Sequence, residues 1–145
     1  MKTIFLTLHL SLFLSVSSCI ESKTHDYRNT WNNQGKELKI LLKSIKSKRT
    51  YICGNHDFPD NFSFPFDNGF YVSYGYGYDE NGKAIRIDNK NLTVKFYTDR
   101  GLMDHYSAFI YSNDKNEIEQ LNNQVESDKK DTDVKLEKNW YYIQE

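Results

Sequence analysis

Residues 58–78 read FPDNFSFPFDNGFYVSYGYGY, and this aromatic stretch decides the expected fold class. Its rings alternate with other residues in two sets, Phe62, Phe64 and Phe66, then Tyr74, Tyr76 and Tyr78. A period of two places side chains on one face of a β-strand. Asp67-Asn68-Gly69 lies between the sets and is a hairpin signal. The stretch therefore predicts two antiparallel strands joined by a turn.

Further strands are expected on both sides of this stretch. Residues 50–53 form a short strand-like run, with a turn at 54–57. Downstream, a turn signal at 79–82 separates residues 70–78 from a further segment at 83–88, and residues 89–91 lead into a strand at 92–97. Leu92, Val94 and Phe96 share one face of this strand, and a turn signal follows at 98–101. Residues 105–111 alternate in the same way, and 136–144 read as one closing strand. The pattern predicts an antiparallel meander of about five to six strands.

Two segments have helical periodicity instead. Between residues 30 and 48, Trp31, Leu38, Leu41, Leu42 and Ile45 recur at helical spacing. A second helix is expected from an Asn113 or Asp114 cap to about Glu126. Helix, strands, helix and strand in this order predict an α+β fold in which the antiparallel sheet packs with an N-terminal and a C-terminal helix.

The first residues have the composition of an export leader. Lys2 is followed by an apolar run from Ile4 to Val16, too short to remain as a membrane span. Val16-Ser17-Ser18-Cys19 resembles the lipobox of bacterial lipoproteins, which implies lipidation of Cys19 and attachment to a membrane through it. We therefore expect a signal peptide at 1–18, a lipidated cysteine and short tether at 19–29, and one domain at 30–145. No family is recognised for that domain.

The two cysteines, Cys19 and Cys53, have different fates in two interpretations of the leader. If Cys19 is lipidated, Cys53 is a lone thiol in an oxidising compartment, where we expect it to be buried. If an ordinary signal peptidase cuts after Ser18, Cys19 is free to pair with Cys53 and the protein is secreted or soluble in the periplasm. An aspartate directly after the cysteine would resemble the inner-membrane retention signal of enteric bacteria. Because Ile20 stands there instead, we expect the lipidated form in the outer membrane.

Charge and composition exclude some partners. The chain has 19 basic and 20 acidic residues, which is not the charge balance of a nucleic-acid-binding protein. No pattern indicates a cofactor. Tyrosines on the expected strands indicate a binding face, with candidate residues Tyr71, Tyr74, Tyr76 and Tyr78.

One candidate for catalysis remains open. Gly54-Asn55-His56-Asp57 resembles one metal-binding block of calcineurin-type metallophosphoesterases, but the further blocks that a two-metal site needs are absent. A smaller metal site could combine four side chains, His56, Asp57, Asp104 and His105.

The leader, the aromatic strands and the lack of a catalytic set favour a cell-envelope lipoprotein that acts as a non-catalytic binding protein, of inhibitor or immunity type. The alternatives are a small metal-dependent hydrolase and a structural component of the envelope.

Overall fold

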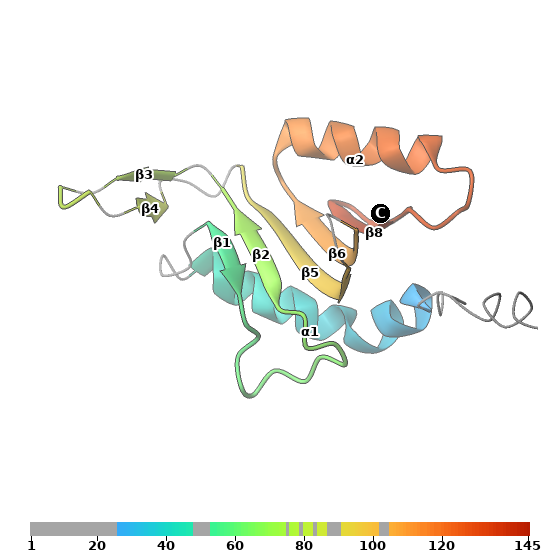
Figure 1. Cartoon of the computed structure of the whole chain (residues 1–145), viewed down its shortest axis with the longest axis horizontal. Coiled ribbons are helices and arrows are strands. Elements are labelled where there is room, and N and C mark those ends of the chain that lie inside the picture. The colour runs from blue at the N-terminus through green and yellow to red at the C-terminus, as the bar shows by residue number, and fades with distance from the viewer. Residues whose placement is uncertain are drawn as a thin grey trace, which may run out of the picture.

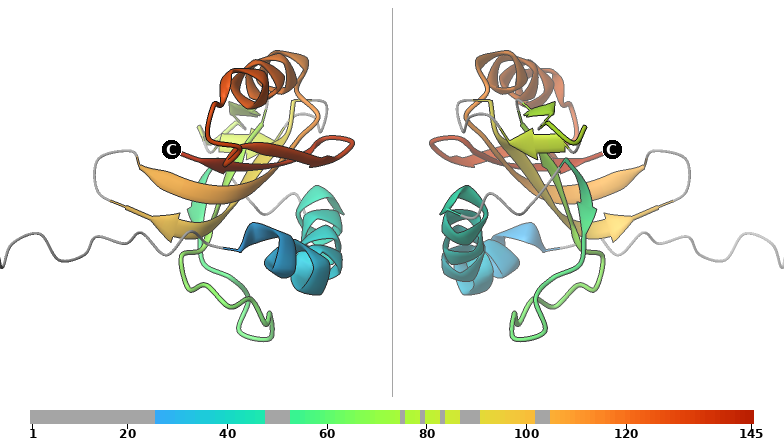
Figure 2. Two further views of the ribbon diagram at one scale, coloured as in Figure 1. Left: turned by 90° about the vertical axis from the view of Figure 1, so that its right-hand side faces the viewer. Right: turned by 90° about the vertical axis from the view of Figure 1, so that its left-hand side faces the viewer.

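A computed structural model of the chain describes residues 26–47, 53–74, 76–78, 80–82, 84–86, 91–101 and 105–145. In these ranges two helices lie on opposite sides of a six-stranded sheet (Figures 1 and 2). The elements are, in order, α1 (Tyr27–Ser47), β1 (Gly54–His56), β2 (Phe70–Ser73), β3 (Tyr76–Tyr78), β4 (Ala84–Arg86), β5 (Thr93–Arg100), β6 (Tyr106–Ser112), α2 (Lys115–Ser127), β7 (Val134–Glu137) and β8 (Trp140–Gln144). The predicted α+β fold with an N-terminal and a C-terminal helix is confirmed.

The main sheet is antiparallel throughout, with the strand order β1-β2-β5-β6-β8-β7. Three pairs of strands that follow each other along the chain are also neighbours in the sheet: β1 with β2, β5 with β6, and β7 with β8. The separate hairpin β3–β4 is inserted between β2 and β5. Because α2 carries the chain past one strand position, β8 returns between β6 and β7. The sheet is thus a meander with one displaced strand.

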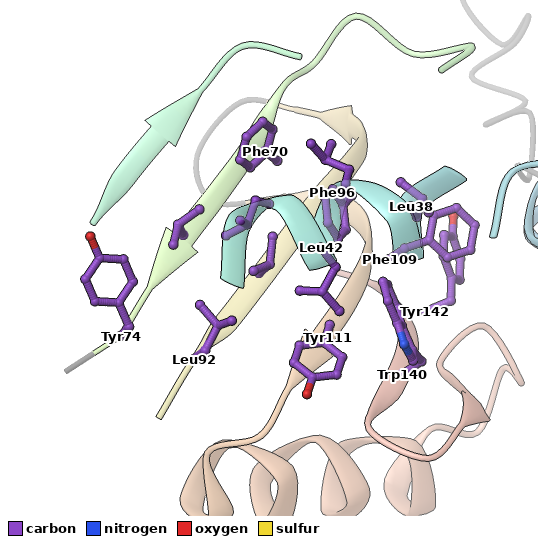
Figure 3. Packing of buried hydrophobic residues seen from close by; sticks show 14 residues of the cluster. Leu38, Leu42, Phe70, Tyr74, Leu92, Phe96, Phe109, Tyr111, Trp140 and Tyr142 are labelled. Atoms are coloured by element: carbon purple, nitrogen blue, oxygen red, sulfur yellow. The ribbon is translucent and has the colours of Figure 1, made fainter. Parts of the chain in front are cut away.

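One face of the sheet packs against α1. Leu38 and Ile45 of this helix are fully buried, and Leu41 and Leu42 nearly so. The strands supply a mostly aromatic layer opposite them, including Phe70, Val72, Val94, Phe96, Phe109, Trp140 and Tyr142 (Figure 3). Large rings bury much apolar area for each residue ordered, which compensates for the small number of aliphatic residues. The face predicted for Leu92, Val94 and Phe96 is confirmed.

The other face carries a second, smaller core beneath α2. Leu121 packs there with residues of β5, β6 and β8, namely Tyr97, Ala108, Ile110, Tyr141 and Ile143. The Asp114 carboxylate caps α2 by accepting hydrogen bonds from the amides of Asn116 and Glu117, at 2.8 and 3.3 Å. On this face Ala108 and Ile110 of β6 and Ile143 of β8 are fully buried, whereas Tyr71 of β2 and Lys95 of β5 are half-buried. The side of β2 and β5 is therefore the less covered part of this face.

The aromatic stretch folds differently from its prediction. Residues 57–69 form a loop, so the predicted strand over Phe62–Phe66 is wrong. Pro59 and Pro65 have no backbone N–H that could donate a hydrogen bond to a neighbouring strand. The rings instead pack on each other: the centroid of Phe58 lies 5.1 Å from those of Phe62 and Phe64. On the side where this strand was predicted, β2 pairs instead with β1, at Gly54–His56, where the sequence indicated a turn.

Other boundaries differ less. The single closing strand predicted at 136–144 is in fact the hairpin β7–β8, with Asn139 at a positive φ of 67° in the turn. β5 continues to Arg100, through the residues that indicated a turn. α1 begins at Tyr27 and includes the last residues of the predicted tether. Cys19 and the rest of the leader lie outside the described residues. No helix in the described ranges is long and apolar enough to cross a membrane.

Candidate functional site

Two adjoining pockets open on the α2 side of β2 and β5, and Lys95 lines both. The larger, of about 430 Å³, is lined by Lys95, Tyr97, Arg100, Gly101, His105, Tyr106 and Glu145. The smaller, of about 210 Å³, is lined by Tyr71, Ser73, Asn91, Thr93, Lys95, Asp114 and Glu117. We call the two together the Lys95 groove.

The alternation of β5 places Lys95 in this groove. Val94 and Phe96 point into the α1-side core, so Lys95 and Tyr97 point to the opposite face. The register puts Tyr71 of β2 opposite Lys95, and Tyr106 of β6 opposite Arg100. The same alternation that builds the core of the protein therefore gathers polar and aromatic groups on its other side.

Lys95 and Tyr106 form the centre of the groove. The Lys95 ammonium donates a hydrogen bond of 3.0 Å to the Tyr106 hydroxyl, and Lys95 Nζ lies 4.8 Å from the centroid of that ring. Lys95 is half-buried and forms no ion pair with any described carboxylate. Burial alone would lower the pKa of Lys95, but the hydrogen bond and charge of Tyr106, with Glu117 and Tyr97, raise it above its usual value. Lys95 is therefore cationic at neutral pH.

The two tyrosines of the larger pocket are neutral at the same pH. Burial raises the pKa of both Tyr97 and Tyr106 above the ordinary value, although neighbouring cations act in the opposite direction. Their rings meet edge to face, with centroids 5.7 Å apart. Because the oxygen of Tyr106 accepts from Lys95, its own O–H remains able to donate.

Arg100 supplies a second cation at the mouth of the groove. Its guanidinium carbon lies 4.5 Å from the centroid of the Tyr97 ring. One terminal nitrogen donates to Asn55 Oδ1 at 2.9 Å, which links the end of β5 to β1. A register shift interrupts the pairing of β5 with β6 between Tyr97 and Asp99, just before Arg100. Among the described residues none accepts from the other guanidinium N–H groups of Arg100, which is exposed at the rim.

Acidic residues lie at the edges of the groove. Glu145 is exposed beside the larger pocket, where its backbone amide donates to the Tyr106 carbonyl at 2.8 Å. Glu117, from the first turn of α2, lines the smaller pocket. The groove therefore has the donors of Lys95 and Tyr106 at its centre and carboxylates at its rim.

The structure places the four candidate tyrosines in different surroundings. Tyr71 is half-buried and lines the smaller pocket, whereas Tyr74 is 5% exposed and belongs to the α1-side core. Tyr76 and Tyr78 lie on the separate hairpin β3–β4, and their side chains are outside the described part of the structure. Tyr71 and Tyr74 thus contribute to opposite faces of the main sheet.

The predicted metal site is not assembled by the residues that the structure describes. His56 lies on β1 with its ring centroid 5.4 Å from that of Phe70, and His105 lines the larger pocket. Among the described ranges, no three His, Cys, Asp or Glu residues come together as metal ligands. Asp104 is outside those ranges, so its part in the site remains a prediction.

Cys53 is half-buried and packs against the α1-side core, with its sulfur 3.5 Å from the Tyr74 carbonyl oxygen. This is less complete burial than the lipoprotein interpretation predicts. Pairing with Cys19 stays an untested alternative, because Cys19 lies outside the described residues.

Sequence reasoning missed Lys95, Tyr97, Arg100 and Tyr106 as site residues. A signal was present: the strand with Leu92, Val94 and Phe96 facing the core must present Thr93, Lys95 and Tyr97 on its other side. The sequence pattern does not indicate how much of that side of the strand α2 covers.

Comparison of the chain with protein-family models, with curated proteins and with solved structures finds no match in any of the three, in agreement with the absence of a recognised family for the domain.

Proposed function

We propose that this protein is a small cell-envelope lipoprotein that acts by binding a protein partner, as inhibitor or immunity-type proteins do, and that the partner contacts the Lys95 groove. The lipobox-like end of the leader, with Cys19 as the lipidated residue, supports the envelope address. The membrane attachment in this proposal is the lipid on Cys19.

One observation carries the binding role: two half-buried tyrosines and an exposed arginine gather at one incompletely covered part of the sheet. Tyr71 and Tyr106 contribute their rings, and Arg100 lies over the ring of Tyr97, which is buried beneath it. Tyrosine and arginine are the residues that most often dominate the energetics of protein interfaces, because they combine apolar area with directed hydrogen bonds. This placement replaces the strand face of Tyr74 as the centre of the proposed interface, since Tyr74 is in the core.

The binding role is tested by site-specific photo-crosslinking in intact cells. A photoreactive amino acid is introduced at Ser73, which lines the smaller pocket, and as a matched control at Ile40, which is 61% exposed on α1 on the other side of the sheet. We expect a discrete crosslinked product from position 73 that is absent from position 40. Identical products from both positions, or none from position 73, would contradict the proposal.

The envelope address has its own test. Mass spectrometry of the mature N-terminus should find a diacyl or triacyl mass on Cys19, and Cys19→Ala should move the protein from the membrane fraction to the soluble fraction. An unmodified N-terminus disulfide-linked to Cys53 would instead identify a secreted or periplasmic domain.

A further inference from the structure

Three side chains of the larger pocket, Lys95, Tyr106 and Arg100, each present a hydrogen-bond donor at neutral pH. The Lys95 ammonium donates one N–H to the Tyr106 oxygen and has two further N–H groups, and the Tyr106 hydroxyl has its own proton to donate. Arg100 adds guanidinium N–H groups beyond the one bound to Asn55. Donors without acceptors in a half-buried pocket are left incompletely satisfied unless water or a ligand supplies oxygen atoms.

The described lining of the larger pocket has two cationic side chains, Lys95 and Arg100, and one carboxylate, Glu145. Lys95 and Arg100 form no ion pair with a carboxylate in the described part of the chain. Glu145 is exposed at the rim, and Glu117, whose charge also acts on Lys95, lines the adjoining smaller pocket. Half-burial strengthens an interaction between Lys95 and an anion that enters, because fewer water molecules screen it.

We propose that the larger pocket of the Lys95 groove binds an anionic group with oxygen acceptors, a carboxylate or a phosphate, between Lys95, Tyr106 and Arg100. The proposal rests on the proposed function, in which the anion is an acidic side chain of the protein partner; a free small anion has the same chemistry. A carboxylate accepts from two or more donors at once, which matches an ammonium, a phenol and a guanidinium on one pocket wall. Glu145 repels the anion from the rim and thereby weakens its binding.

The test is a titration of the isotopically labelled full-length protein in detergent, followed by NMR shifts of the backbone amides of the larger pocket. Acetate and inorganic phosphate are the free anions, and sodium chloride at equal ionic strength is the control salt. Two capped tripeptides, with Glu or Gln at the centre, represent the side chain of a partner. We expect saturable shifts with at least one anion and with the Glu peptide, and none that saturate with chloride or the Gln peptide.

Three variants of the chain sharpen the result. Lys95→Met should weaken binding roughly tenfold, because one charge-assisted hydrogen bond is lost. Glu145→Gln should strengthen it about twofold to fivefold, the usual worth of an exposed charge interaction. Lys43→Met, on the exposed face of α1, should leave it unchanged. A decrease in affinity in Lys95→Met together with an increase in Glu145→Gln cannot arise from a general loss of folding. Thermal unfolding of each variant checks its folding independently.

The outcomes separate the two sources of the anion and the two proposals. Binding of the Glu peptide identifies a partner side chain, while binding of a free anion without the peptide identifies a small ligand. No saturable shift with any probe, or equal affinity in Lys95→Met and the unmodified chain, overturns the anion site. In that case a position-73 crosslink would still support the protein-binding role, whereas loss of both results would remove both proposals.

Discussion

Gly69 packs directly against the backbone of His56, and a Cβ on Gly69 would overlap the His56 carbonyl oxygen. Gly69 has a φ of +66°, and its own carbonyl accepts a hydrogen bond of 3.2 Å from the Tyr97 amide. At this point the loop 57–69 closes β1 onto β2 and β5.

Replacing Gly69 with alanine should therefore destabilise the protein by about 3 kcal/mol, since a strained backbone conformation and a steric overlap add together. Urea denaturation followed by circular dichroism measures the change. Gly82 is the matched control, because it also has a positive φ, 75°, but its Cβ would meet nothing within 4 Å. Gly82→Ala should cost about 1 kcal/mol. Equal losses in the two variants would contradict the close packing of Gly69 on His56.

The contribution of α1 to stability depends on its buried stripe. Leu38 is fully buried against the aromatic layer of the sheet, whereas Ile40 on the same helix is 61% exposed. Leu38→Ala should reduce the free energy of unfolding by about 3 kcal/mol, through lost burial and a cavity. Ile40→Ala should change it by less than about 0.5 kcal/mol. Urea denaturation of both variants checks the pair, and comparable losses would mean that α1 is not docked as described.

The start of α2 depends on a single carboxylate. Asp114 Oδ1 accepts from the amides of Asn116 and Glu117. Asp114→Ala should cost about 1 kcal/mol, because two amide donors lose their acceptor, while Asp114→Asn should retain most of the stability. Thermal unfolding of the two variants gives the comparison. An asparagine variant as unstable as the alanine one would show that charge, rather than capping geometry, stabilises this end.

The loop between α2 and β7 makes stability depend on acidity. Asp128 accepts hydrogen bonds from the amides of Asp133, Lys130 and Thr132, which lower its pKa to about 2. A carboxyl whose pKa is lower in the folded than in the unfolded chain stabilises the folded state. This stabilisation is complete at pH values above the pKa in the unfolded chain, about 3.9, and is lost as the pH falls towards about 2. Asp128→Asn should therefore destabilise the protein at neutral pH, and the difference from the unmodified chain should shrink across that window.

Urea denaturation of the two proteins at a series of pH values measures this difference. Asp133 acts in the opposite sense, because burial raises its pKa and its ionised form is less stable in the fold. The charge of Asp128 contributes to this raised pKa, so Asp128→Asn also removes part of the cost of ionising Asp133 and makes the measured difference smaller. A difference that stays constant from neutral pH down to about 2 would contradict the role of the Asp128 carboxylate.

Local patterns in the sequence were enough to predict those helices and strands whose apolar residues recur with a clear period. The period of α1, the Asp114 cap of α2 and the alternation of Leu92, Val94 and Phe96 each identify an element and its buried side, because a helix or strand repeats its orientation over a few residues. The α+β class follows from the order of those elements.

The tertiary structure alone decided which segments pair and what stays uncovered. Gly54–His56 is a strand only because β2 lies beside it, and the phenylalanines of the loop 57–69 pack on each other rather than alternate. Lys95 meets Tyr106 and Arg100 meets Asn55 only after distant strands have taken their register. A sequence window records the period of a segment, but strand pairing and the coverage of a sheet face depend on contacts between residues far apart in the chain.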